Sequence, residues 1–150
     1  MPTQIPKVVV DYFSSFTPGF RLVDGGQLAT MVKLQYSATS GLTALAGGGQ
    51  PGATLLSAAI NEISTVATTG DSVMLPLGLP GMAVIAINDG ANTMQVYGQA
   101  TNPNTGVGDT IAANNSTTQA ATTTGVSQAS AKVASYLCFA AGKWKQLLSG

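Results

Sequence analysis

The residue types that most often perform chemistry in proteins are scarce in this chain of 150 residues. It has no histidine, which removes the usual general base near neutral pH, Ser-His-Asp and Cys-His catalysis, and nearly all zinc sites. The single cysteine, Cys138, lies in an apolar segment, where a small buried residue is expected. We therefore expect no catalytic residue, no metal and no cofactor, and a protein that is not an enzyme.

The six acidic residues are scattered along the chain as Asp11, Asp24, Glu62, Asp71, Asp89 and Asp109. Their spacing does not indicate two carboxylates that face each other across a cleft, as a glycosidase requires. The run Asn88-Asp89-Gly90 and the following Ala91-Asn92 offer oxygen ligands for calcium. They lack the loop spacing and closing glutamate of a calcium loop, so we interpret them as a turn.

Two further patterns have a chemical and a structural interpretation. Residues 46–52 (AGGGQPG) are rich in glycine but lack the Gly-Lys-Ser/Thr that closes a phosphate loop, which favours a flexible connector. The triplet Lys143-Trp144-Lys145 combines cations with an aromatic ring, as nucleic-acid-binding proteins do. On a strand the two lysines point away from Trp144, which favours a core ring between two outward lysines.

The composition is poor in charge, with six Lys or Arg and six Asp or Glu, and the net charge is zero. A net charge near zero favours association. The chain has no basic balance to attract nucleic acid and no basic amphipathic segment for a membrane surface, so we expect neither partner. The longest uncharged apolar stretch, residues 73–87, is broken by proline and glycine and is too short for a transmembrane helix. The N-terminal MPTQIPKVVV does not have the pattern of a signal peptide, and with one cysteine we expect synthesis in a reducing cytoplasm.

Residues 71–98 hold the strongest strand signals. The apolar run 82–87, the turn Asn88-Asp89-Gly90 and the alternating run 93–97 predict a β-hairpin at the centre of the core. A strand over about 59–67 and a second hairpin, 133–139 with 144–148, complete the prediction. The first strand of this hairpin alternates, with Val133, Leu137 and Phe139 on one face and Tyr136 and Cys138 on the other. The fold class is mainly β, with a small β-sandwich or jelly-roll-like body over residues 46–150.

Residues 112–130 are rich in Thr, Ala, Ser and Asn and leave two interpretations open. The segment is either a long, poorly packed excursion or a set of short Thr-rich strands that face each other across a symmetric contact. We favour the strands, because threonine suits a pleated, half-buried surface.

The N-terminal residues 1–45 are predicted to form a docking arm with one short helix. The helix is expected over residues 24–37, where Asp24 and Gln27 have the spacing of a capping box. Four aromatic residues lie close together before it: Tyr12, Phe13, Phe16 and Phe20. They either pin the arm to its own domain or bury their rings on a partner or another subunit, since exposed apolar patches mark interfaces.

A series of short motifs follows in order between residues 41 and 148. These are residues 43–44 (TA), 46–50 (AGGGQ), 53–54 (AT), 60–61 (IN), 65–68 (TVAT), 71–73 (DSV), 75–76 (LP), Gly81, 88–92 (NDGAN), 95–97 (QVY), 109–111 (DTI), 125–128 (GVSQ), Tyr136, Cys138 and 141–144 (AGKW). The ordered set resembles a module of tailed-phage virion structural proteins, of the head decoration (capsid cement) type. This chain departs from that pattern where Ala112-Ala113 stand in place of Asn-Gly, and where residues 99–108 are longer.

The resemblance implies a small β-sandwich or jelly-roll-like domain that decorates a phage head from outside. Its partners would be the major capsid protein and further copies of itself, as a homotrimer in preference to a dimer, and its location the virion surface. Tyr12, Phe13, Phe16 and Phe20 are then the candidate capsid or subunit contacts. The family offers no catalytic residues. Two other hypotheses remain: a tail-fibre or spike module that binds host-surface glycans, and a wall-degrading virion hydrolase.

Overall fold

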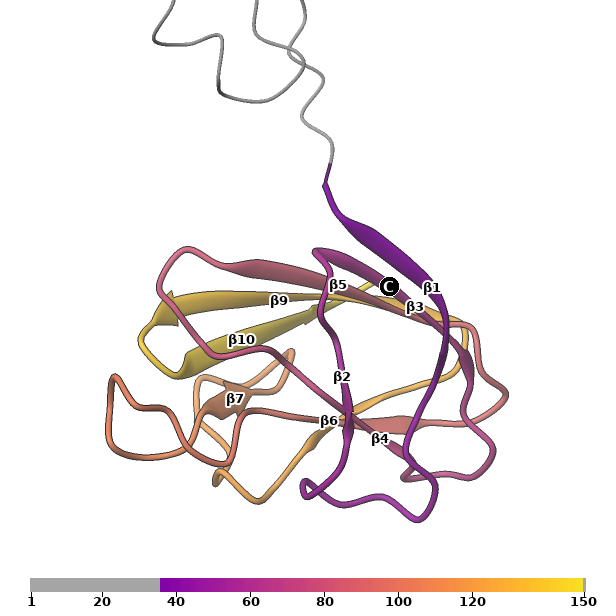
Figure 1. The fold of residues 1–150 in the computed structure, drawn as a ribbon, viewed down its shortest axis with the longest axis horizontal. Coiled ribbons are helices and arrows are strands. Elements are labelled where there is room, and N and C mark those ends of the chain that lie inside the picture. The colour runs from indigo at the N-terminus through magenta and orange to yellow at the C-terminus, as the bar shows by residue number, and fades with distance from the viewer. Residues whose placement is uncertain (1–35, 150) are drawn as a thin grey trace, which may run out of the picture. The chain divides into compact units, whose positions relative to one another are not determined.

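The computed structural model describes residues 36–149, and this part of the chain is built of strands without a helix. The strands form two sheets that pack as layers (Figure 1). The predicted mainly β body is therefore confirmed. The predicted helix over 24–37 lies outside the described residues except for Tyr36 and Ser37, which are not helical.

Ten strands make up the two sheets. They are β1 (Ala38–Thr43), β2 (Thr54–Leu55), β3 (Ile60–Thr65), β4 (Ser72–Met74), β5 (Ala83–Asn88), β6 (Met94–Tyr97), β7 (Thr110–Ala112), β8 (Val126–Gln128), β9 (Lys132–Ala140) and β10 (Lys143–Leu148). The six-stranded sheet has the order β1-β3-β5-β9-β10-β7, and the four-stranded sheet has the order β2-β4-β6-β8. The first strand, which we assigned to the arm, is thus an edge strand of the larger sheet.

From β1 to β8 the chain changes sheet at every strand. As a result β1, β3 and β5 lie side by side and parallel in one sheet, and β2, β4 and β6 do the same in the other. Parallel neighbours need a crossover connection, and here each crossover contains a strand of the opposite sheet. The first part of the body is therefore a short coil of β-strands, which the C-terminal hairpin closes.

The predicted central hairpin is wrong in its pairing, although both of its strands exist. β5 and β6 belong to different sheets. The side chain of Asn88 accepts a hydrogen bond from the N–H of Gly90 (3.1 Å) and donates to the carbonyl of Asn92 (3.0 Å). It also donates to the carbonyl of Gln128 at 3.0 Å. These bonds make the turn a corner that leads the chain from one sheet to the other.

The corner is fixed against the previous turn of the coil. The Asn92 amide donates to the carbonyls of Val66 and Ala67, both at 2.9 Å. A Cβ atom on Gly90 would lie 2.5 Å from the Val66 nitrogen, so only glycine permits this approach. Gly90 and Asn92, which predicted a hairpin turn, therefore allow two successive connections to pack closely against each other.

The second predicted hairpin is confirmed. β9 and β10 pair antiparallel through a turn at Ala141 and Gly142. Trp144 is fully buried and points into the core, while Lys143 and Lys145 lie on the opposite face of β10. The alternation along β9 also holds, with Tyr136 and Cys138 inside.

The other strand predictions hold in part. The strand expected over 59–67 is β3, and residues 46–52 form a connector without regular structure. The Thr-rich segment was predicted to form strands, but residues 113–125 are irregular and only β8 follows. Alanine and threonine here pack as a loop over the sheet edge instead of as a pleated surface.

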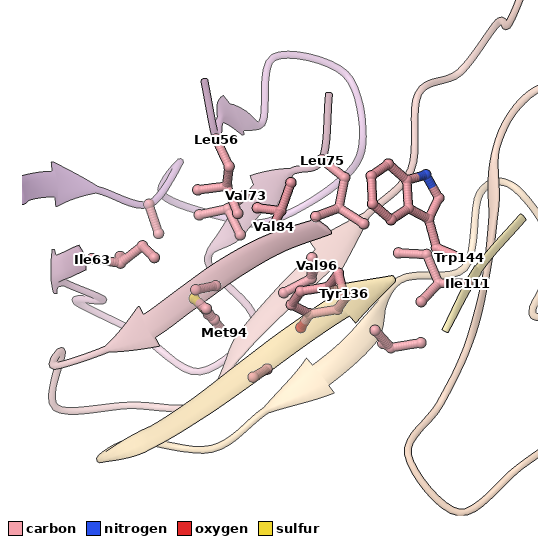
Figure 2. Close-up of a cluster of buried hydrophobic side chains, with 14 of the residues drawn as sticks. Leu56, Ile63, Val73, Leu75, Val84, Met94, Val96, Ile111, Tyr136 and Trp144 are labelled. Atoms are coloured by element: carbon pink, nitrogen blue, oxygen red, sulfur yellow. The ribbon is translucent and has the colours of Figure 1, made fainter. Parts of the chain in front are cut away.

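The core lies between the two sheets and draws on both. Figure 2 shows the larger apolar side chains filling this space, with Ile63 and Trp144 at opposite ends of the cluster. Tyr136 and Trp144 are its largest members, and both have no exposed surface. Each aromatic carries a polar atom into the core, so each needs a buried hydrogen-bond partner.

The turn before β9 gives a test of backbone strain. Ala131 has φ of 56°, in the left-handed region that disfavours residues with a Cβ atom. We expect Ala131→Gly to raise the free energy of unfolding by about 0.5–1 kcal/mol, measured by urea denaturation. The matched control is Ala129→Gly in the same turn, where φ is not positive and glycine should lower stability. A loss of stability for both variants would contradict the assignment of strain to Ala131.

Candidate functional site

The four predicted contact residues, Tyr12, Phe13, Phe16 and Phe20, lie outside the described residues. Residues 36–149 contain two features that are candidate sites. One is a set of buried polar side chains at the connections between strands. The other is an exposed apolar surface on the six-stranded sheet.

Asp109 is the centre of the first feature. It is fully buried at the start of β7. Its Oδ2 accepts hydrogen bonds from the N–H of Gly78 (2.8 Å) and from Nε1 of Trp144 (3.3 Å). Its Oδ1 accepts from Nδ2 of Asn102 at 2.7 Å. One carboxylate therefore joins the connection after β4, the loop before β7 and strand β10.

Glycines make room for this carboxylate. A Cβ atom on Gly78 would lie 2.9 Å from Asp109 Oδ2, and one on Gly98 would lie 2.7 Å from the Asp109 Cβ. Gly142 has φ of +66°, and a Cβ there would lie 2.9 Å from Oδ1. The backbone of three glycines thus lies close around the carboxylate, as a structural junction requires.

A second buried group links the two sheets. The Tyr136 hydroxyl on β9 donates to Oε1 of Gln128 on β8 (3.0 Å) and accepts from Nε2 of Gln146 on β10 (3.0 Å). The Gln128 amide also donates to the carbonyls of Ala86 and Lys132. Burial raises the pKa of the Tyr136 hydroxyl, so it stays protonated and serves as a neutral hydrogen-bond donor.

Asp71 closes the turn before β4. Its Oδ1 accepts from the Thr68 hydroxyl (2.7 Å) and the N–H of Gly47 (3.1 Å), and its Oδ2 accepts from the N–H of Thr68 (2.9 Å). The Thr68 hydroxyl, followed by the Thr68 N–H, holds the pKa of this carboxyl below its ordinary value of 3.8. The Asp71 carboxylate thereby ties the glycine-rich connector to the body.

Lys145 also serves the fold. Its Nζ donates to the carbonyls of Ala113 (2.6 Å), Asn114 (3.0 Å) and Ser116 (2.6 Å). All three ammonium donors are therefore used by the loop that follows β7. Of the two lysines beside Trp144, this one is committed to the structure, while Lys143 is exposed.

These groups satisfy one another. In the described part of the chain every buried side-chain nitrogen or oxygen has a hydrogen-bond partner. The same residues contain no cluster of His, Cys, Asp or Glu suited to a metal ion. Cys138 is buried, and burial raises the pKa of its thiol. These buried polar groups hold the fold together.

The second feature is the outer apolar face, on the side of the six-stranded sheet away from the core. It consists of Ile60, Ile85, Ile87, Val133, Leu137, Phe139 and Leu147. Phe139 is 61% exposed, and Val133, Leu137 and Leu147 are each 40% exposed or more. An apolar surface of this kind, gathered on one sheet face, is typical of a binding surface.

The alternation along residues 133–139 predicted that Val133, Leu137 and Phe139 share one face of a strand. It did not predict that this face is exposed. The sequence indicates this face only when several predicted strands are compared with one another. β5, β9 and β10 each carry apolar residues on both faces, whereas a sheet with one face in water alternates apolar with polar residues.

Comparison with family models, with curated proteins and with solved structures finds no match to this chain. Residues 36–149 contain no helix with the length and hydropathy that a membrane crossing requires.

The Asp109 junction predicts a large effect of a small change. Asp109→Asn keeps the shape but replaces one acceptor oxygen with an NH₂ group that faces donors. We expect the free energy of unfolding to fall by about 2–4 kcal/mol, because buried donors lose their partner. Calorimetry of the variant measures it, with Asp89→Asn as the control, since Asp89 is exposed. Equal melting temperatures for the two variants would show that the junction is not needed.

Asp71 predicts a dependence of stability on acid. Because its pKa is lowered in the folded state, its contribution is complete above the ordinary value of 3.8 and is lost as the pH falls through the lower folded value. We expect the wild-type chain to lose stability below about pH 4 more steeply than Asp71→Asn does. Urea titrations at several acidic pH values test this. Parallel curves for the two proteins would refute it.

Proposed function

We propose that this chain is a phage capsid decoration (cement) protein that binds the outside of the head shell and stabilises it as a symmetric oligomer. The major capsid protein is its partner, and the virion surface is its location. The resemblance favours a homotrimer at three-fold positions, with a dimer at two-fold positions as the other symmetric form. The role is structural and uses no catalytic residue or cofactor.

The observation that carries the proposal is the ordered motif set between residues 41 and 148. Of the nine buried polar residues in the described part, all except Asn102 and Gln146 lie within these motifs. The motifs therefore mark the side chains that close turns and crossovers. A set that specifies a fold, and not a reaction, is what a structural virion protein needs.

The physical properties of the body support the same role. A cement protein stabilises a shell by mass action, because it binds the assembled lattice and not the free subunits. It needs contact area in place of reactive groups. The outer apolar face offers such area for contact between copies of the oligomer, and the buried polar side chains of the described residues all have partners within the body.

The glycan-binding alternative depends on exposed aromatic rings beside acids and amides. Trp144, the single tryptophan, is fully buried and gives its indole nitrogen to Asp109. It offers no ring face to a sugar. The described residues therefore favour the cement role over a tail-fibre or spike module.

Counting copies in purified virions tests the proposal. We expect this chain in numbers comparable with the major capsid protein when both are quantified by mass spectrometry, since a decoration protein occupies repeated shell positions. A tail protein of the same particle serves as the low-copy control. Immunogold labelling should mark the head. Absence from the virion, a few copies per particle, or label confined to the tail would overturn the proposal.

A further inference from the structure

The outer apolar face has an ordered layout that the strand register defines. Across β3, β5, β9 and β10 one row contains Ile60, Ile85, Ser135 and Leu147. The row on one side contains Glu62, Ile87 and Val133, and the row on the other side contains Ala83, Leu137 and Lys145. Phe139 lies beyond Leu137 on β9. Apart from Ser135, the centre is therefore apolar, and the charges stand at its margins.

The edges of this sheet are poorly suited to pairing with another chain. β1 pairs with β3 through two register shifts, and Gly41 within it has φ of +75°. At the other edge, β7 is bridged to Gln119, and the Ala120 N–H donates to the carbonyl of Ile111. Bulges and covering segments are means by which proteins prevent edge-to-edge association. A second copy would thus meet the face of the sheet and not its edge.

Two opposite charges mark diagonal corners of the face. Glu62 lies on β3 beside Ile87, and its Oε2 accepts from the N–H of Gly41 at 2.7 Å, which holds the carboxylate at that corner. Lys143 is exposed at the far end of β10, where it pairs with Ala140. The midpoint between the two corners falls between β5 and β9, near Ile85, Ser135 and Leu137.

This layout is complementary to itself. A two-fold axis between two facing copies maps each corner onto the opposite corner of the other copy, so Glu62 meets Lys143 twice. This axis is perpendicular to the line that joins Glu62 and Lys143 on one copy. With strands about 4.8 Å apart and about 6.8 Å per two residues along a strand, the axis lies at about 55° to the strands. The two sheets then cross at about 70°, close to the orthogonal class of sheet packing.

We propose that the outer apolar face pairs two copies of this chain about a two-fold axis, with Glu62 of each copy against Lys143 of the other. The pairing does not depend on a capsid, so it goes beyond the proposed decoration role. It also selects a dimer in place of the trimer that the resemblance favours.

The size of the face fits a modest interface. The four strands that carry the face, β3, β5, β9 and β10, span about 19 Å and are about 20–30 Å long, which gives a usable footprint of roughly 450 Å² per copy. The total of about 900 Å² is the size of a weak, transient interface. The dimer should accordingly be weak and dissociate on dilution.

Sedimentation velocity of the full chain over a wide concentration range tests the pairing. We expect a monomer–dimer equilibrium, and we expect Leu137→Lys to weaken it by about tenfold or more, because two lysines would then lie at the desolvated centre. The control is Val107→Lys, since Val107 is 66% exposed in a loop away from the face. It should leave the equilibrium unchanged, and circular dichroism should show that both variants are folded.

A charge exchange tests the orientation. Glu62→Lys and Lys143→Glu should each weaken the dimer by about tenfold, since each places like charges together at two symmetric positions. The double variant restores both pairs and should return the dissociation constant to within about threefold of the wild type. A monomer at every concentration, a trimer, indifference to Leu137→Lys, or a double variant no better than the single variants would each overturn the proposal.

Discussion

The hydrogen bonds of the buried Asp109 carboxylate are the interaction on which this fold most depends. A chain that changes sheet at every strand must cross the ends of the core repeatedly, and its connections cannot use a regular ladder to satisfy their backbone groups. Asp109 solves this at one end of the sandwich. It holds the N–H of Gly78, the amide of Asn102 and the indole of Trp144 in one place.

Other connections use the same solution with neutral groups. Asn88 closes the corner between β5 and β6, and the Gln128–Tyr136–Gln146 chain ties the sheets together through the core. Such networks are favourable only when every member is satisfied, because an unpaired buried polar atom is costly. This explains how a chain with so few charges has many polar residues inside. These polar residues determine which connections pack against each other. Apolar packing alone would not specify this arrangement.

Local alternation predicted the strands but not all of their partners. β9 and β10 were predicted as a pair because a short turn at Ala141-Gly142 joins them, and the structure pairs them in one sheet. The turn at Asn88-Asp89-Gly90 has residues suited to a hairpin, yet it forms a corner. The deciding contacts join Asn88 to Gln128 and Asn92 to Val66, far away in the sequence. Neither contact can be predicted from a local sequence pattern, because each joins residues far apart in the sequence.

The candidate sites, like the strand pairing, could be predicted only in part from the sequence. The motif residues Asp71 and Asp109 were visible in the sequence, but their burial depends on neighbours such as Gly47 and Gly98, which only the folded chain brings close. Lys145 was expected to be a plain outward lysine, and its three bonds to the loop after β7 required that loop to be placed. The outer apolar face could have been found by comparing strands, because it is a property of several strands in register.

The winding of the first strands has a consequence for synthesis. β5 obtains its second neighbour only from β9, which the ribosome makes after β6, β7 and β8. Until then the coil of β1 to β6 has an open edge at β5 and lacks Tyr136 and Trp144, the largest side chains of the core. The core is therefore closed only when the hairpin of β9 and β10 has been made and has paired with the open edge of β5.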